Sequence, residues 1–548
     1  MSGSSKLAEG KAPFGAFPSG SLSSWLIKLL ILGFIDVLGI WAISKSITAQ
    51  WWPAVFFIGA VLLAMNVVYF QKGALPWKYL LPGLVFLIGF QLFPAGYTFF
   101  ISFTNYGTGH IISQDKAVGA IVSQNVRPVE GAQSFDVRPI ESGGEVAMLI
   151  TDPETGEAFV GTSTSLEPAP GATFEGDTAV SADGYTTLLL GDLASDPALD
   201  EQWRALAVPF DADQGFYIQQ SSPTRGSLVV SSLAYDPEAD TFTDVESGKV
   251  FSPNTDVGLY TTDAFDPDAK AGSPPSSEKS SENAGEFLTP GWSVFVGLEQ
   301  YTQIVTDESV RSNFFPILLW SFAFAIGTVL MQFALGLLMA MVFQEKRMRG
   351  QKIYRAILII PYALPIFMTA LVWKGMLNRD FGIINQILGQ EIWWLGDPWL
   401  AKLSLLVVNL WIGYSYFFIV VTGALTAIPG DLKEAAFVDG ASGFKAFRTV
   451  VLPLLMVAVS PLLIASFSFN FNNFTLVDLL TGGGPFPSSP IDGGQTDLLI
   501  TYTYRLAFGT SEQFLAFASA ISMLIFLIVA GFSAFGFRLT KRLEEIKV

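Results

Sequence analysis

Eight apolar stretches, each of about 20 residues or more, limit what this chain can fold into. A stretch of that length crosses the hydrocarbon core of a bilayer as one helix, because a helix pairs its backbone polar groups internally. The predicted spans are Trp25–Ser44, Trp52–Phe70, Leu80–Phe103, Phe314–Phe343, Tyr354–Met376, Leu403–Ile428, Val450–Phe471 and Gln513–Phe537. The first lacks the position and cleavage site of a removed signal peptide. We therefore predict an all-α polytopic membrane protein with eight transmembrane helices.

A long acidic insert separates the third span from the fourth. Residues 104–313 hold 33 acidic and 9 basic residues, a net charge of −24, whereas the rest of the chain carries +7 of the total −17. The insert is too polar for lipid and long enough to bury a core. Its short apolar runs between Gly, Asp and Pro turns predict strands, so we expect a mixed α/β or β-rich domain. These runs are Val146–Ile150, Thr186–Leu190, Ser227–Val230, Phe216–Gln220 and Tyr260–Phe265.

Two further segments of the insert have their own patterns. The composition of Gly272–Gly285 predicts a flexible tether, and Leu298–Phe315 has a helical pattern.

Basic residues predict the orientation. With the N-terminus inside, 16 Lys and Arg residues fall on the cytoplasmic side and four in the short outer loops. The predicted organisation is a cytoplasmic segment 1–24, spans in 25–103, a periplasmic insert 104–313, spans in 314–537 with a cytoplasmic loop 429–449, and a cytoplasmic tail 538–548.

The composition excludes several kinds of chemistry. The chain has no Cys and one His, His110, which rules out thiolate and histidine metal clusters. It also lacks the Gly-x-x-x-x-Gly-Lys-Ser/Thr pattern of phosphate-binding loops. We therefore expect no catalytic, cofactor-binding or metal-binding residue, and hence no enzyme. The main ionisable groups in the spans are Asp36 and Lys374; Asp36 either pairs structurally or has a functional role.

The loop after the sixth span has the pattern of a surface helix between two spans. Pro429 and Gly430 end the preceding helix, and Asp431 is expected to cap a short helix that runs to Asp439. Gly440 is expected to stop that helix in the left-handed conformation.

The same loop resembles the EAA loop of ABC-importer permeases, with Val where that family usually has Ile at the third anchor. The resemblance rests on Glu434-Ala435-Ala436, Gly440 and Val450-x-Leu452-Pro453. It implies that this loop is a coupling helix that inserts into a separate ATP-hydrolysing subunit. The coupling residues that it implies are Glu434, Ala435, Ala436, Asp439, Gly440, Leu452 and Pro453.

Further stretches resemble the MalF-like permeases of binding-protein-dependent ABC sugar importers. They are Leu463–Leu480, Thr481–Pro485 and Thr496–Phe508; the similarity is dense from about Asn313 to Lys541, visible at Ser102–Tyr106 and faint across most of the insert. The resemblance implies the type I importer permease fold and transport of maltose, maltodextrins or a related α-glucoside across a bacterial inner membrane. The implied partners are a second, MalG-like permease, a MalK-like ATPase dimer that binds ATP and Mg, and a periplasmic sugar-binding protein.

Two polar stripes are the candidate substrate site. Ser466, Phe469, Asn470 and Asn473 are spaced as one face of the seventh helix, and the sixth span offers Asn409, Trp411, Ile412, Gly413 and Tyr416. Amides suit sugar hydroxyls and aromatic rings suit sugar C–H faces, and in the resembling family the equivalent stripes line the sugar pocket. The alternative is that these residues only join helices.

Two other classes of function remain as alternatives. A secondary sugar transporter would need an ion-coupling carboxylate in its spans. A membrane-anchored sensor would use the insert as a receptor and would need no path through the membrane.

Overall fold

The computed structural model describes residues 22–48, 51–71, 73–129, 131, 133–169, 171–211, 215–265, 286–343, 349–487, 492–509 and 513–545. The chain divides into two compact units. The first comprises Met1–Gly96 and Val122–Ser232, and the second comprises Tyr97–Ile121 and Leu233–Val548. The predicted insert contributes to both units.

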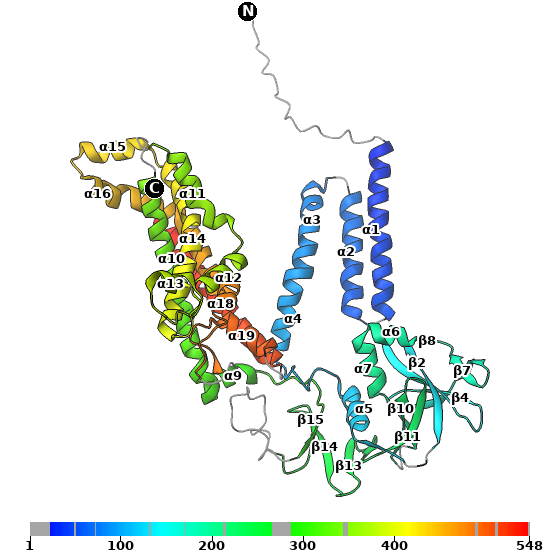
Figure 1. The fold of residues 1–548 in the computed structure, drawn as a ribbon. Coiled ribbons are helices and arrows are strands. Elements are labelled where there is room, and N and C mark those ends of the chain that lie inside the picture. Colours follow the sequence, from blue (N-terminus) through cyan, green and yellow to red (C-terminus); the bar gives the residue numbers. More distant parts are fainter. Residues whose placement is uncertain are drawn as a thin grey trace, which may run out of the picture. The chain divides into compact units, whose positions relative to one another are not determined.

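The first unit begins with apolar helices that expose most of their side chains. They are α1 (Leu22–Thr48), α2 (Trp52–Phe70) and α3 (Leu75–Leu87). Helix α3 continues through a π-helical turn at Ile88–Leu92 into α4 (Phe93–Ile101), which belongs to the second unit from Tyr97 onward. Helices α1 and α2 pack side by side (Figure 1). Between them the Asn66 amide donates to Asp36 Oδ1 at 2.8 Å, so the carboxyl group has a structural partner.

A nine-stranded antiparallel sheet forms the rest of this unit, in the order β5-β4-β3-β2-β11-β10-β9 with β1 beside β11 and β8 beside β2. The strands are β1 (Val126–Pro128), β2 (Ser134–Ser142), β3 (Glu145–Thr151), β4 (Ala158–Gly161), β5 (Leu166–Pro168), β8 (Thr186–Thr187), β9 (Ala207–Asp211), β10 (Phe216–Ser222) and β11 (Arg225–Ser231). A separate hairpin joins β6 (Thr173–Glu175) to β7 (Thr178–Ser181). Trp203 of α7 (Pro197–Ala205) is buried against the sheet with Met148 and Val208.

Three of the strand predictions in this region are confirmed, and one is largely wrong. Strands β3, β10 and β11 contain the predicted runs. Of Thr186–Leu190, only the first two residues form a strand, because helix α6 (Leu190–Ser195) begins at the end of the run.

The second unit contains a five-stranded antiparallel sheet. Its strands are β12 (Leu233–Asp236), β13 (Thr241–Asp244), β14 (Val250–Asn254), β15 (Leu259–Thr261) and β16 (Phe287–Leu288). Strand β15 therefore covers only the start of the predicted run Tyr260–Phe265. The predicted tether Gly272–Gly285 lies outside the described residues.

Aromatic rings hold the small sheet together, and a carboxylate joins two of them. Phe242 contacts Tyr235 and Tyr260, each with ring centroids 4.8 Å apart. Asp240, at a φ of 51°, accepts hydrogen bonds from Tyr235 at 2.8 Å and from Tyr260 at 2.5 Å. Gln114, in helix α5 (Gln114–Gln124), donates to the other carboxylate oxygen at 2.8 Å.

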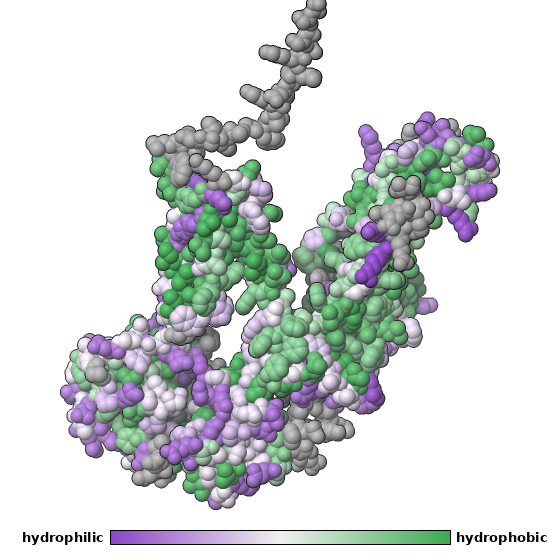
Figure 2. Space-filling view, turned by 180° about the vertical axis from the view of Figure 1, so that it is seen from behind, coloured by the Kyte–Doolittle hydropathy of each residue, from purple (hydrophilic) through white to green (hydrophobic). Residues whose placement is uncertain are grey.

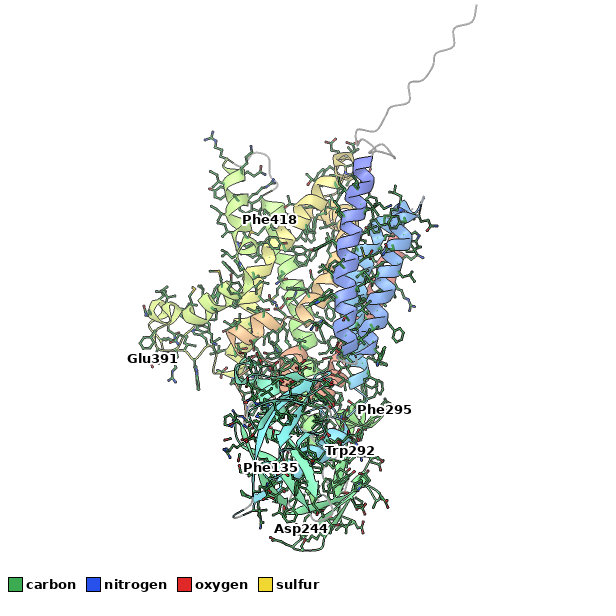
Figure 3. All side chains as sticks on the ribbon, turned by 90° about the vertical axis from the view of Figure 1, so that its right-hand side faces the viewer. Phe135, Asp244, Trp292, Phe295, Glu391 and Phe418 are labelled. Atoms are coloured by element: carbon green, nitrogen blue, oxygen red, sulfur yellow. The ribbon has the colours of Figure 1, made fainter. Side chains whose placement is uncertain are left out.

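The helices of the second unit pack around α10, α14, α17 and α20, with Phe417, Phe418, Phe471 and Phe517 buried among them. Phe418 is labelled among these helices in Figure 3. The elements are α9 (Glu299–Thr306), α10 (Glu308–Val342), α11 (Gln351–Ala363), α12 (Ile366–Met376), α13 (Ile383–Leu388), α14 (Pro398–Ala427), α15 (Gly430–Val438), α16 (Gly443–Ala446), a π-helical turn (Phe447–Val451), α17 (Leu452–Phe471), α18 (Phe474–Leu480), α19 (Leu499–Phe508) and α20 (Leu515–Glu545). The helices carry a largely apolar surface, whereas polar side chains gather over the sheets (Figure 2).

Two helix predictions need correction. The run Leu298–Phe315 is two helices, because the chain breaks at Asp307, whose side chain accepts from the Val310 backbone N–H. The fifth predicted span is also broken, with α11 and α12 meeting at 92°. Leu364 precedes Pro365 and is extended there, since a residue before proline avoids the helical region.

The membrane-crossing helices are consequently counted in two ways. Within the described residues, seven helices are long and apolar enough to cross a bilayer, or eight if the bent pair counts as one span. The all-α description holds for this helical part only, because the insert is β-rich.

Candidate functional site

Three buried asparagines meet between helices α14 and α17. Asn409 of α14 donates to Asn470 Oδ1 of α17 at 2.8 Å and lies 3.4 Å from Thr328 Oγ1 of α10. Asn473 in turn donates to Asn409 Oδ1 at 3.5 Å. We call Asn409, Asn470 and Asn473 the amide cluster. Mutual hydrogen bonds offset the high cost of an amide in apolar surroundings.

Asn473 reaches the cluster from outside helix α17. The predicted single helical stripe is wrong at this position, because α17 ends at Phe471. Asn473 is instead the N-cap of α18, where its Oδ1 accepts from the Leu476 backbone N–H. A turn of the chain, rather than helical periodicity, brings it beside Asn409.

Two polar residues of α10 complete the surroundings of the cluster, and the sequence prediction did not include them. Gln332 is buried, and its side-chain amide donates to the backbone carbonyl of Asn409 at 2.7 Å. It also lies over Gly413, where a side chain would overlap the Gln332 amide. Thr328 and Gln332 are four residues apart in an otherwise apolar helix, and this spacing is a signal that could have found them.

The remaining candidate residues have different surroundings. The Ser466 carbonyl accepts from Asn470 at 2.8 Å, and Ile412 packs among apolar side chains. Two aromatic residues pack against the bent helix pair: Trp411 against Trp373, at 5.9 Å between centroids, and Tyr416 against Tyr362, at 6.1 Å. Phe469 is 58% exposed, and the structure does not bring it to the cluster.

Helix α15 occupies the loop predicted to couple the protein to an ATPase. It begins at Gly430, after Pro429, and the predicted cap at Asp431 is wrong because that residue lies inside the first turn and Pro429 precedes the helix. The predicted stop is confirmed: Gly440 has a φ of +79°, and its N–H donates to the Phe437 carbonyl at 3.0 Å. Helices α15 and α16 lie at one end of the helical bundle (Figure 1).

The candidate coupling residues differ in exposure. Glu434, Ala435, Asp439 and Gly440 are exposed, Ala436 is buried, and Leu452 and Pro453 are half-buried at the start of α17. The apolar residues Phe437, Val438 and Phe444 are also exposed. This end of the bundle therefore combines a carboxylate with uncovered apolar side chains.

A buried ion pair outside the predicted site fixes the loop that leads into α19. Asp497 is fully buried and pairs with Arg505. Its oxygens also accept from the Gly494 backbone N–H at 2.6 Å and from the Thr501 hydroxyl at 2.8 Å. Arg505 donates to the Gly482 carbonyl at 3.2 Å. The ion pair therefore contacts both Gly482 and Gly494, which lie before and within the loop that leads into α19. In the described part of the chain, no group of three His, Cys, Asp or Glu residues could hold a metal ion.

Two family models match the chain. The N-terminal domain of the transmembrane subunit in binding-protein-dependent ABC transporters matches residues 85–164, and the inner membrane component of binding-protein-dependent transport systems matches residues 332–542. The second match includes the amide cluster and the whole of α15. The two matches thus define the chain as an inner-membrane permease subunit of a binding-protein-dependent ABC importer.

Individual relatives show to which family of permeases the chain belongs. The MalF maltose/maltodextrin transport system permease proteins of Vibrio cholerae serotype O1 and Escherichia coli (strain K12) are 34% and 33% identical to the chain. The matches cover 85% and 89% of this chain and 86% and 91% of those proteins. The chain belongs to the MalF family of permeases. A solved bacterial alginate ABC transporter chain matches 45% of this chain, and 84% of its own length, at 20% identity and a TM-score of 0.39.

Proposed function

We propose that this permease subunit carries maltose, maltodextrins or a related α-glucoside across the membrane. Relatives that match most of its length include maltose/maltodextrin permeases, and a buried cluster of amides suits a substrate rich in hydroxyl groups. Its partners would be a MalG-like permease, a MalK-like ATPase dimer and a periplasmic sugar-binding protein.

The proposed topology has eight spans, with the bent pair α11–α12 counted as one. Both termini, 1–24 and 538–548, would be cytoplasmic, as would the coupling loop 429–449, and the insert 104–313 would be periplasmic. The excess of Lys and Arg on the proposed inner side supports this orientation.

The amide cluster is the observation that carries the proposed path. Each amide now bonds to another amide, and a sugar hydroxyl can replace such a partner because it both donates and accepts. The proposed site comprises Asn409, Trp411, Ile412, Gly413, Tyr416, Ser466, Phe469, Asn470 and Asn473. Trp411, Tyr416 and Phe469 would supply ring faces for the sugar.

Helix α15 would couple ATP hydrolysis by the partner ATPase to the movement of the permease helices. ATP and Mg would bind to the partner ATPase, and the residues that contact it would be Glu434, Ala435, Ala436, Asp439, Gly440, Leu452 and Pro453. The exposed apolar side chains beside Glu434 support this assignment, because a stable subunit contact buries apolar area.

ATP hydrolysis by the assembled complex tests the proposal. The complex would be purified in lipid with its binding protein and assayed with a panel of glucosides. We expect one sugar to stimulate hydrolysis, and we expect Asn470→Ala to abolish uptake of that sugar. The matched control is Asn472→Ala, because Asn472 is a neighbouring but exposed amide.

Other outcomes would favour the competing functions. Uptake that survives ATP depletion but collapses with the ion gradient would indicate a secondary transporter. Unchanged function in Asn470→Ala, without stimulation by any sugar, would indicate a sensor.

A further inference from the structure

The segment between α12 and α14, residues 377–397, is a folded element rather than a loose loop. Asn385 is buried at its centre and donates to the carbonyls of Arg379 at 3.0 Å and Ile392 at 2.8 Å. The side-chain oxygen of Asn385, Oδ1, accepts from the Trp394 indole N–H at 2.8 Å. One side chain thus ties three points of the segment together, and the segment therefore holds a fixed surface.

That surface is strongly apolar. Phe381 is 82% exposed, Ile387 77% and Trp393 58%, and Trp399 in the first turn of α14 is 77% exposed. The inward side chains, Ile384, Trp394 and Leu395, pack into the helical core instead. Figure 3 shows the segment, marked by Glu391, projecting to the side of the helices. An apolar face of this kind is costly to expose to water, and it is typical of a surface that contacts a membrane or another protein.

Basic side chains lie over tryptophan rings on this face. The Arg379 guanidinium lies 5.5 Å from the Trp393 ring, and Lys402 Nζ lies 5.1 Å from the rings of both Trp399 and Trp320. Tryptophan rings beside Lys or Arg are typical of the layer between lipid tails and water, where the ring is partly buried and the cation meets phosphate.

The position of the segment matches that layer. It joins α12 to α14, and the apolar run of α14 begins at Leu403, directly after Lys402. Trp320, whose ring Lys402 also contacts, marks the same level on α10. The exposed face is therefore continuous with the lipid-facing surface of a membrane span.

We propose that the apolar face of residues 377–397, with Trp399, lies in the interfacial layer of the bilayer on the side of the insert. The lipid surface is its occupant, and the face anchors the bent helix α12 and the start of α14 at a fixed depth. Glu391, an exposed acidic residue of the same segment, lies at the watery edge of this face.

Single cysteines test this directly, because the chain has none of its own. Phe381→Cys and Ile387→Cys would carry an environment-sensitive fluorophore in the complete complex, built with cysteine-free partners. The complex would be placed in nanodiscs of phosphatidylethanolamine and phosphatidylglycerol, with or without a lipid that carries a spin label near its headgroup. Matched controls are Glu391→Cys in the same segment, where Glu391 is exposed, and Asp244→Cys in the insert, where Asp244 is partly exposed at the end of β13.

We expect the labels at 381 and 387 to lose about half of their fluorescence to the spin-labelled lipid, since interfacial side chains lie within about 5–10 Å of the headgroups. The labels at 391 and 244 should keep theirs. Equal quenching at all four positions, or at none, would overturn the proposal. Shielding at 381 and 387 that appears only with the binding protein, or crosslinking of these positions to the second permease in place of lipid quenching, would assign the face to a protein partner instead.

Discussion

Gly440 sets the end of helix α15 through one backbone angle. Its φ of +79° lies in the left-handed region, which an L side chain enters at a cost of roughly 1–2 kcal/mol. Apart from its own chain neighbours, no atom of the described residues lies within 4 Å of the position that its Cβ would take, so the constraint is the backbone conformation and not space.

This separates two substitutions at the same site. Gly440→Val should lower sugar-stimulated ATP hydrolysis, because a β-branched residue resists a positive φ and shifts the end of α15. Gly440→Asn should retain most of that activity, because Asn tolerates this conformation. Assays of the two purified complexes decide the matter; equal activities would show that the angle is unimportant for coupling.

Two tyrosines of the insert, Tyr235 and Tyr260, are expected to make the insert less stable at alkaline pH. Burial and the bond to Asp240 raise the pKa of Tyr235 to about 12, and the same causes raise the pKa of Tyr260. Since unfolded tyrosine ionises near pH 10, the stabilisation is complete below about pH 10 and is lost as pH rises towards 12.

The melting temperature of the isolated insert, residues 104–313, should therefore fall between about pH 10 and 12. In Tyr235→Phe the slope of that fall should be smaller, because one ionising group has been removed. A slope that is identical in the variant would contradict the assignment.

At the scale of elements, two glycines decide how closely α10 and α14 approach. A Cβ on Gly336 would lie 2.6 Å from the Cβ of Phe417 and 2.8 Å from the backbone N of Phe418, neither of which can turn aside. Gly413, on the facing helix, leaves room for Gln332. The contact that holds the amide cluster thus depends on the absence of side chains.

We expect Gly336→Ala to separate the two helices and to lower the thermal stability of the purified complex by several degrees, a loss of about 1–3 kcal/mol from overpacking. Gly327→Ala is the matched control, because it lies on the same helix with nothing within 4 Å of its Cβ. If both variants have the same melting temperature as the parent complex, the close approach of the two helices does not contribute to stability.

At the scale of the whole molecule, residues 122–232 are built as an insertion whose ends meet. The Ser232 backbone N–H donates to the Asn125 carbonyl at 2.8 Å, and β1 pairs with β11. Its apolar core, which includes Trp203 and Ile218, comes entirely from this stretch. Adjacent ends and a closed core are the properties of a domain that tolerates insertion.

The segment 122–232 should therefore fold by itself. We expect the isolated polypeptide to be soluble and to unfold in a single thermal transition by circular dichroism, with Trp203→Ala lowering that transition strongly, because Phe/Trp→Ala in a core costs about 3–5 kcal/mol. An unfolded parent segment would mean that the membrane helices are needed for its structure.

The sequence by itself determined the features that are local in the chain. Apolar length marked the membrane helices, composition marked the acidic insert, and short apolar runs between turn residues marked β3, β10 and β11. The left-handed stop at Gly440 was also predictable, because glycine is the residue that adopts a positive φ without strain.

Only the tertiary structure decided which distant residues meet. Helical spacing placed Asn470 on a stripe, but a turn after α17 brings Asn473 to Asn409, and Gln332 comes from a helix that held no candidate residue. The 92° break between α11 and α12 was likewise missed, because the apolar run Tyr354–Met376 was predicted as one span. The physical reason is that hydropathy and backbone propensity act within a few residues, whereas the partner of a buried amide is set by how whole helices pack.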